Sequence, residues 1–239
     1  MKPTVVLVHG AFAESSSWNS VIDTLLSSGY HAVAAANPLR GIAGDAAAVS
    51  DLVRSIEGPV LLVGHSYGGA VITDVDRDAG DIRGLVYVCG FAPDAGESAA
   101  DLSSKVPGGT LGETLSAVEL TGGGSDLYIA QDRFHQQFTA DSPPDVAARM
   151  AVTQRPVTEI GLSGPAGPDP LWKVVPSWFV YGELDRNIPA GAHQFMAERA
   201  QGREIVEVPG AAHALPVSRP DEVAHMILEA ARAVELVDA

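Results

Sequence analysis

A serine flanked by glycines stands at the end of an apolar run in this chain. The segment is Gly64-His65-Ser66-Tyr67-Gly68, in the spacing G-x-S-x-G, after the β-branched run Val60–Val63. The run predicts a buried strand and Ala70–Ala79 predicts a helix, which is the strand–turn–helix context that this motif requires. Such a turn exposes the serine hydroxyl as a nucleophile. It also directs the helix N-terminus and the Tyr67 N–H toward a developing oxyanion.

A nucleophilic serine needs a general base, and position in the chain selects one of the seven histidines. His213 follows the last expected strand, Glu204–Val208, in the loop Pro209–Pro216. A parallel sheet places its active site in the loops at the carboxyl ends of its strands, so this loop opens on the face that carries Ser66. We therefore predict that His213 is the general base.

The base needs an acidic residue to orient it, and three carboxylates are candidates. Asp185 lies in the loop after the expected strand Ser177–Tyr181. It is favoured because the chain order Ser…Asp…His is typical of this strand–turn–helix architecture. Glu183, in the same loop, and Asp94, after the fourth expected strand, remain alternatives.

The other histidines receive structural interpretations. His65 is expected to pack or hydrogen-bond behind the serine, and His9 to shape the loop beside it. His135, His193 and His225 fall in helical stretches, so we expect them to be surface or cap residues.

A second oxyanion donor is expected in the loop His9–Phe12, after the first strand. Gly10 lets the backbone approach the reaction centre, and the Ala11 N–H would pair with the Tyr67 N–H. Removing one such donor costs about 3–4 kcal/mol of transition-state stabilisation. Metal-ligand spacing such as H-E-x-x-H is absent from the sequence, as is a G-x-G-x-x-G after a strand, so no metal or cofactor is expected.

Alternating strand-like and helix-like runs must position these residues. Continuous apolar strands alternating with helices predict a six-stranded, mainly parallel sheet covered by helices on both faces. The expected strands are Thr4–Val8, His31–Ala36, Val60–Val63, Ile82–Cys89, Ser177–Tyr181 and Glu204–Val208. The expected helices are Ser15–Ser28, Asp45–Ile56, Ala70–Ala79, Ala190–Ala200 and about Arg219–Val237.

The alternation is interrupted between Asp94 and Lys173 by a long stretch rich in glycine and proline. Two parts of it, Asp126–Phe138 and Pro143–Gln154, have a helical pattern. A segment this long is too large for a plain loop. We predict a helical cap at 94–173, inserted in an α/β core made of residues 1–93 and 174–239.

The amino-acid composition indicates which classes of binding partner are disfavoured. The 239 residues carry a formal net charge of −15, which opposes binding to nucleic acid or to an anionic membrane surface. There is no apolar stretch long enough for a membrane span, and the N-terminal residues lack signal-peptide features, so we expect a cytoplasmic protein. The single cysteine, Cys89, lies in an apolar run and is expected to be a buried thiol. A homodimer is left open.

Four of these motifs together resemble the α/β-hydrolase superfamily over almost the whole chain. They are His9–Phe12, Gly64–Gly69, Asp185 and Gly210–His213. The stretches VLVHGAF, LVGHSYGG and YVCGFAPDAGES are similar to the compact esterases grouped with plant methyl esterases and hydroxynitrile lyases. The resemblance implies the α/β-hydrolase fold, a helical cap, no cofactor, a catalytic triad of Ser66, Asp185 and His213, and oxyanion donors at Ala11 and Tyr67.

The chain departs from the lyase branch of that group at two positions. The lyases carry a threonine where Gly10 stands and a lysine, which stabilises departing cyanide, where Ala214 stands. We therefore expect a serine hydrolase that cleaves small, largely apolar carboxylic esters or lactones through an acyl-enzyme. The alternatives are a lyase or carbon–carbon bond hydrolase with the same triad, and a ligand-binding receptor with slow incidental hydrolysis.

Overall fold

The computed structural model describes residues 1–235, and in these residues six parallel strands form one sheet. Its strand order is β2-β1-β3-β4-β8-β9, and every neighbouring pair is parallel. The expected six-stranded parallel sheet is therefore confirmed. The strands are β1 (Thr4–Val8), β2 (Ala32–Ala35), β3 (Pro59–His65), β4 (Asp81–Val88), β8 (Ser177–Gly182) and β9 (Ile205–Val208).

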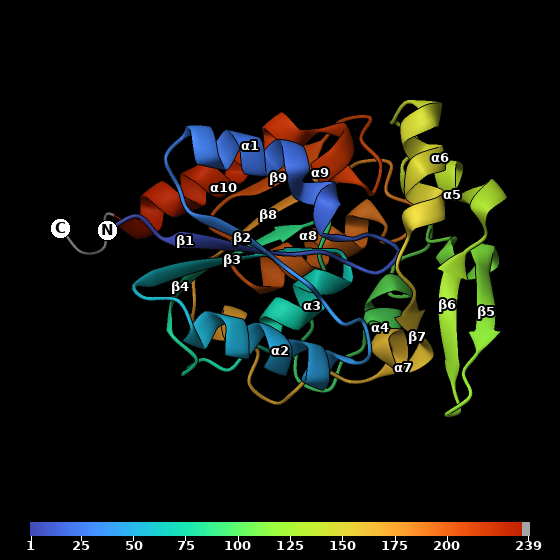
Figure 1. Ribbon diagram of the computed structural model, residues 1–239, viewed down its shortest axis with the longest axis horizontal. Coiled ribbons are helices and arrows are strands. Elements are labelled where there is room, and N and C mark those ends of the chain that lie inside the picture. Colours follow the sequence, from blue (N-terminus) through green and yellow to red (C-terminus); the bar gives the residue numbers. More distant parts are fainter. Residues whose placement is uncertain (236–239) are drawn as a thin grey trace.

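Alternate residues of the buried strands enter two separate hydrophobic cores, because successive side chains of a strand point to opposite faces. Val6, Val8 and Leu62 pack on one face with helices α2 (Ile42–Arg54), α3 (Tyr67–Thr73) and α8 (Ala190–Arg199). Val5, Leu7 and Leu61 pack on the other face with α1 (Asn19–Ser27) and α10 (Pro220–Glu235). Figure 1 shows α1 and α10 on one side of the sheet and α2 and α3 on the opposite side. The remaining short elements of the core are η1 (Ser15–Trp18) and α9 (Leu215–Ser218).

The register of the central strands brings their carboxyl ends to one edge. Val8 pairs with Gly64 across β1 and β3, and His65 pairs with Val88 across β3 and β4. The loop after β1 and the turn after β3 therefore start side by side, as the sequence predicts for a parallel sheet.

Residues 99–163 lie beyond this edge, at one end of the molecule (Figure 1). Residues after 163 run back along the core, where the Gly167 N–H donates to Asp74 at the end of α3. We expected helices in the segment 94–173, and for Asp126–Phe138 that expectation is wrong over Asp126–Ile129. Ser125–Ile129 is a strand, β6, paired with β5 and β7 in an antiparallel sheet. Gly123 and Gly124 have positive φ and form the turn that closes the β5–β6 hairpin. The segment contains α4 (Ala99–Ser103), η2 (Leu111–Thr114), β5 (Leu115–Glu119), β6, α5 (Gln131–Phe138), α6 (Pro144–Thr153), β7 (Val157–Thr158), α7 (Glu159–Ser163) and η3 (Leu171–Lys173).

Several helix boundaries differ from those expected, and α2 spans Ile42–Arg54 where we expected Asp45–Ile56. Helix α3 begins at Tyr67, directly after the serine, and ends at Thr73, whereas we expected Ala70–Ala79. The C-terminal helix begins at Pro220, and its expected end at Val237 lies outside the described residues.

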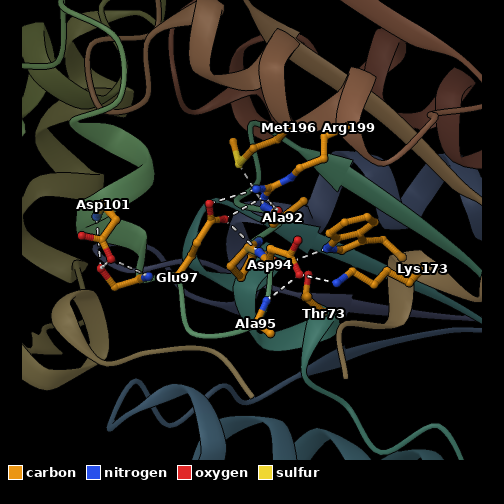
Figure 2. A network of polar contacts seen from close by, with 12 residues as sticks. Thr73, Ala92, Asp94, Ala95, Glu97, Asp101, Lys173, Met196 and Arg199 are labelled. Carbon is orange, nitrogen blue, oxygen red and sulfur yellow. Dashed lines mark hydrogen bonds and ion pairs between the residues drawn. The ribbon is translucent and has the colours of Figure 1, made fainter. Parts of the chain in front are cut away.

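Polar contacts hold both ends of the segment 94–173 beside helix α8 of the core, as Figure 2 shows. The guanidinium of Arg199 on α8 donates to both carboxylate oxygens of Glu97, at 2.9 and 2.8 Å, and to the carbonyl of Ala92 at 2.8 Å. Lys173, at the far end of the segment, forms an ion pair with Asp94 at its start. The chain therefore leaves the core and returns to it at the same point.

Helices long and apolar enough to cross a membrane are absent from the described residues. The cytoplasmic location, the homodimer and the division into core and cap at residues 94 and 173 stay predictions.

Candidate active site

Ser66 occupies a strained turn between β3 and α3. Its φ of 54° and ψ of −123° lie outside the regions that residues with a Cβ usually adopt. The turn depends on close backbone contacts, because a Cβ at Gly64 would come 2.5 Å from the Gly68 carbonyl oxygen. A Cβ at Gly68 would overlap the carbonyl oxygen of Val8 on the neighbouring strand. The G-x-S-x-G spacing therefore has a steric origin.

The Ser66 side chain is less exposed than we expected. Only 7 % of the residue is accessible. Ser66 lines a largely apolar cavity of about 80 Å³. The core contributes Ala11 and Tyr67 to the walls, and the segment 94–173 contributes Ala99, Leu111 and Leu162.

Phe12 lines both this cavity and a larger groove of about 390 Å³. Its φ is +60°, an unusual value for an aromatic residue. The Phe12 N–H donates to the Arg155 carbonyl at 3.0 Å. The Phe12 and Phe138 rings pack edge-on, with their centroids 6.4 Å apart. These contacts hold the loop after β1 against the segment 94–173.

The two expected oxyanion donors lie beside Ser66. Tyr67 is the first residue of α3, where a backbone N–H has no acceptor within the helix and the helix dipole is positive. Ala11 lies on the opposite loop and lines the same cavity. Gly10 makes this approach feasible, since a Cβ there would stand 2.6 Å from the Ser66 Cβ.

Asp185 and His213 form a direct hydrogen bond inside the protein. The Nδ1–H of His213 donates to Oδ2 of Asp185 at 2.6 Å, and both side chains are fully buried. The two residues follow β8 and β9, which are neighbours at the same sheet edge as Ser66. Sequence reasoning had chosen this pair from chain order, and the structure brings it together.

The Asp185 carboxylate is held by further donors. Its Oδ1 accepts the backbone N–H groups of Asn187 at 2.8 Å and Ile188 at 2.9 Å. Burial opposes its ionisation, but the imidazoles of His213 and His193 outweigh that effect and lower the pKa of Asp185 well below its ordinary value. The carboxylate is therefore ionised at neutral pH and accepts hydrogen bonds only.

The second ring nitrogen of His213, Nε2, is buried without a hydrogen-bond partner in the described part of the chain. His65, next to Ser66 in the chain, links His213 to the serine turn. The Nε2–H of His65 donates to the His213 carbonyl at 3.0 Å. Burial, and then the nearby His213, lower the pKa of His65 to about 3, so this ring stays neutral. A hydrogen bond between Ser66 and His213 is not among the contacts of residues 1–235; such bonds often tighten only when substrate is bound.

The alternative acids have other partners. The carboxylate of Glu183 is exposed and accepts the Gly210 N–H at 2.8 Å. Asp94 forms an ion pair with Lys173. The geometry therefore favours Asp185.

The expectation that His193 is a surface or cap residue is wrong. It belongs to α8 in the core, is 2 % exposed, and its Nε2–H donates to Oδ2 of Asp185 at 3.1 Å. Of the other two helical histidines, His225 is exposed and His135 bonds the Ser142 carbonyl at 3.0 Å. Nδ1 of His9 lies 2.9 Å from the Gly10 carbonyl oxygen, beside the serine turn. This contact agrees with the loop-shaping role that we expected for His9.

A buried carboxylate also holds the residue after the serine. The Tyr67 hydroxyl donates to Oδ2 of Asp45 at 2.8 Å, and burial followed by the Asp45 charge raises the pKa of Tyr67. Asp45 also accepts the backbone N–H groups of Arg40 and Gly41. We had assigned Asp45 only to a helix start, because nothing in the local sequence pairs it with Tyr67.

Cys89, Asp185 and His193 are a buried trio in the described residues whose metal-binding atom types lie within 4.8 Å of one another. Burial raises the pKa of the Cys89 thiol, and the Asp185 charge raises it further. The Asp185 oxygens already accept four N–H donors. Hydrogen bonding within the protein therefore accounts for the cluster.

Solved structures with the same fold cover nearly the whole chain. Tomato methylketone synthase I superposes with a TM-score of 0.82 at 19% identity, covering 98% of this chain and 99% of its own. Polyneuridine aldehyde esterase superposes with a TM-score of 0.79 at 17% identity, covering 96% and 99%. At these identities the likeness shows the fold.

The amino-acid sequence of the chain is also similar to those of curated proteins and of a protein family. An alpha/beta hydrolase of Aspergillus novofumigatus is 27% identical over 99% of this chain and 100% of its own length. A carbendazim hydrolyzing esterase of a Nocardioides species is 34% identical, over 42% of this chain and 47% of its own. Residues 5–226 match the description "Alpha/beta hydrolase family". The chain belongs to the alpha/beta hydrolase family.

Proposed function

We propose that the protein hydrolyses small, largely apolar carboxylic esters or lactones with Ser66 as the nucleophile. Ser66 Oγ attacks the ester carbonyl while Nε2 of His213 takes its proton, and the N–H groups of Ala11 and Tyr67 stabilise the oxyanion. His213 then gives the proton to the departing alkoxide. Water, deprotonated by His213, cleaves the acyl-enzyme and releases the carboxylic acid. Asp185 orients His213 and stabilises its imidazolium.

The buried Asp185–His213 hydrogen bond of 2.6 Å is the observation that carries this proposal. It fixes the proton of neutral His213 on Nδ1, so the free lone pair is on Nε2, the unpartnered atom. A base at this sheet edge needs that tautomer to accept the Ser66 proton. The strained turn at Ser66 supplies the matching nucleophile.

The shape of the site favours a short acyl group. The cavity of about 80 Å³ at Ser66 accommodates a few carbon atoms, and its apolar walls would bind them without polar partners. The larger groove beyond Phe12 is open to solvent and offers room for the alcohol part of the ester.

The loop that holds His213 supports hydrolysis over cyanide release. Ala214 is buried and its N–H donates to the Phe138 carbonyl at 2.9 Å. The stretch Pro209–Pro216 contains no lysine or arginine that would stabilise a cyanide anion. Relatives named carbendazim hydrolyzing esterase and pyrethroid hydrolase add support for hydrolytic chemistry.

The test is hydrolysis of p-nitrophenyl acetate by the wild-type protein and by Ser66→Ala. We expect kcat to fall by at least about 10⁴-fold in the variant, because the nucleophile is lost. Ser104→Ala, which removes an exposed hydroxyl outside the cavity, is the matched control and should keep full activity. Activity of Ser66→Ala above a few per cent of wild type would contradict the proposal.

An acyl-chain series then measures the cavity. We expect kcat/KM to be highest for p-nitrophenyl acetate or propionate and to fall steeply for octanoate. A maximum at octanoate would show that the cavity does not hold the acyl group.

A further inference from the structure

A second histidine shares the carboxylate oxygen that orients His213. Oδ2 of Asp185 accepts the Nδ1–H of His213 at 2.6 Å and the Nε2–H of His193 at 3.1 Å. His193 lies on α8, eight residues after Asp185, and its side chain is 2 % exposed. The nucleophile, base and acid of the proposed triad do not require this second donor.

The position of the His193 ring is fixed by packing. It stacks on the ring of Tyr181 from β8, with centroids 5.0 Å apart and planes 18° from parallel. This stack, together with the turn of α8, holds Nε2 toward Asp185. The contact is therefore built into the core and does not depend on a mobile surface side chain.

The protonation state of His193 follows from its surroundings. Because an ionised carboxylate only accepts, the Nε2 of His193 must carry a proton. Burial lowers the pKa of His193, while the Asp185 charge and the Gly90 carbonyl act against this effect and His213 adds to it. The ionisable groups that face the ring or its partner carboxylate are Asp185, His213, the Cys89 thiol and the Tyr181 hydroxyl. The ring is neutral at neutral pH and acts as a hydrogen-bond donor.

We propose that His193 is a positioning residue that acts through Asp185, by fixing the rotation of the carboxylate and by taking up part of its negative charge. This inference rests on the proposed function, because it concerns how strongly Asp185 stabilises the imidazolium of His213. Two donors on one oxygen divide its charge between them. Losing His193 would leave more of that charge to His213 and would make His213 more basic. It would also remove one of the four N–H donors that hold the carboxylate in place.

The kinetic test compares His193→Phe with His193→Gln across pH 5 to 9, with p-nitrophenyl acetate. Phenylalanine fills the space without a donor, whereas the glutamine amide can place an N–H near the position of Nε2. In His193→Phe we expect the acid limb of kcat/KM to move up by about half to one pH unit, the effect of one ordinary hydrogen bond. We expect kcat to fall several-fold at little change in KM. In His193→Gln both effects should be largely reversed.

The control is His225→Phe, an exposed position on α10, which should keep the wild-type pH profile. A wild-type pH profile in His193→Phe would overturn the proposal, as would a His193→Gln variant that behaves like His193→Phe.

A measurement on the unaltered protein avoids the risk that the variants fail to fold. In protein labelled with ¹⁵N-histidine, His193 should show a slowly exchanging proton on Nε2 from pH 6 to 8. A ring without that proton would overturn the proposal. This result does not depend on ester hydrolysis, so it separates a failure of the His193 assignment from a failure of the proposed function.

Discussion

The two halves of the candidate site are built by different means. The nucleophile half, comprising Ser66, Tyr67 and Ala11, depends on backbone surfaces in close contact at Gly10, Gly64 and Gly68. The acid–base half depends on side-chain hydrogen bonds, with four donors converging on the Asp185 carboxylate.

The difference determines how each half responds to substitution. In the nucleophile half there is no space for an added methyl group, so a substitution there acts through steric overlap. In the acid–base half a lost acceptor leaves buried donors unpaired, which costs about 1–3 kcal/mol for each group. A comparison of the two halves therefore needs one substitution of each kind.

Of the two substitutions, the one in the acid–base half, Asp185→Asn, is expected to have the larger effect on rate. An amide nitrogen in place of one oxygen cannot accept the His213 Nδ1–H, so the wrong tautomer is favoured. By analogy with the serine-protease triad, kcat should fall by up to about 10⁴-fold. The control is Glu183→Gln, which contacts Gly210 and not His213, and which should lose less than about 10-fold. A larger loss in Glu183→Gln would show that the acid is misassigned.

A steric change in the nucleophile half should cost stability as well as rate. In Gly68→Ala the added Cβ overlaps the Val8 carbonyl oxygen, so β1 and its loop must shift. We expect a loss of about 1–3 kcal/mol in unfolding free energy, with kcat/KM falling more than 10-fold as Ala11 moves. Gly44→Ala, on α2 with nothing within 4 Å, is the control and should stabilise the protein by about 0.5 kcal/mol. Equal stability of Gly68→Ala and wild type would refute the steric account.

Both halves contain a neutral buried histidine, which makes stability depend on pH. Burial lowers the pKa of His65 to about 3 and also lowers that of His193, whereas in the unfolded chain both lie near 6.5. Below pH 6.5 the unfolded state therefore binds protons that the folded state excludes, so stability falls as pH falls. Each histidine contributes about 1.4 kcal/mol per pH unit until its folded-state pKa is reached.

Urea unfolding between pH 7.5 and 5 measures this slope. Asp185, whose pKa is lowered, loses its stabilising effect only below about pH 4. It therefore does not change the slope of stability between pH 7.5 and 5. His193→Gln should reduce the slope and His225→Gln should not. A stability that is flat across this range would contradict the assignment of neutral buried histidines.

The sequence predicts the parallel core well, because its signals are local. Continuous apolar runs such as Val60–Val63 and the G-x-S-x-G spacing leave few alternatives to a buried strand followed by a tight turn. Chain order then selected Asp185 and His213, and the structure joins them at 2.6 Å.

What the sequence did not predict depends on contacts between distant residues. Asp126–Ile129 was expected to belong to a helix, but the pairing of Ser125–Ile129 with Leu115–Glu119 and Val157–Thr158 makes this stretch a strand. His193 was expected to be a surface or cap residue because it falls in a helical stretch, and nothing in the local sequence indicates a buried partner. Only the packing of α8 against β8 places it on Asp185.

The most direct test of the serine mechanism is covalent labelling with diisopropyl fluorophosphate, which reacts with activated serines. We expect a single adduct, located on Ser66 by peptide mass spectrometry, formed rapidly in the wild-type protein. It should form far more slowly in His213→Gln, which lacks the base, and at wild-type rate in the control His225→Gln. An unlabelled protein, or an adduct on a serine other than Ser66, would contradict the account.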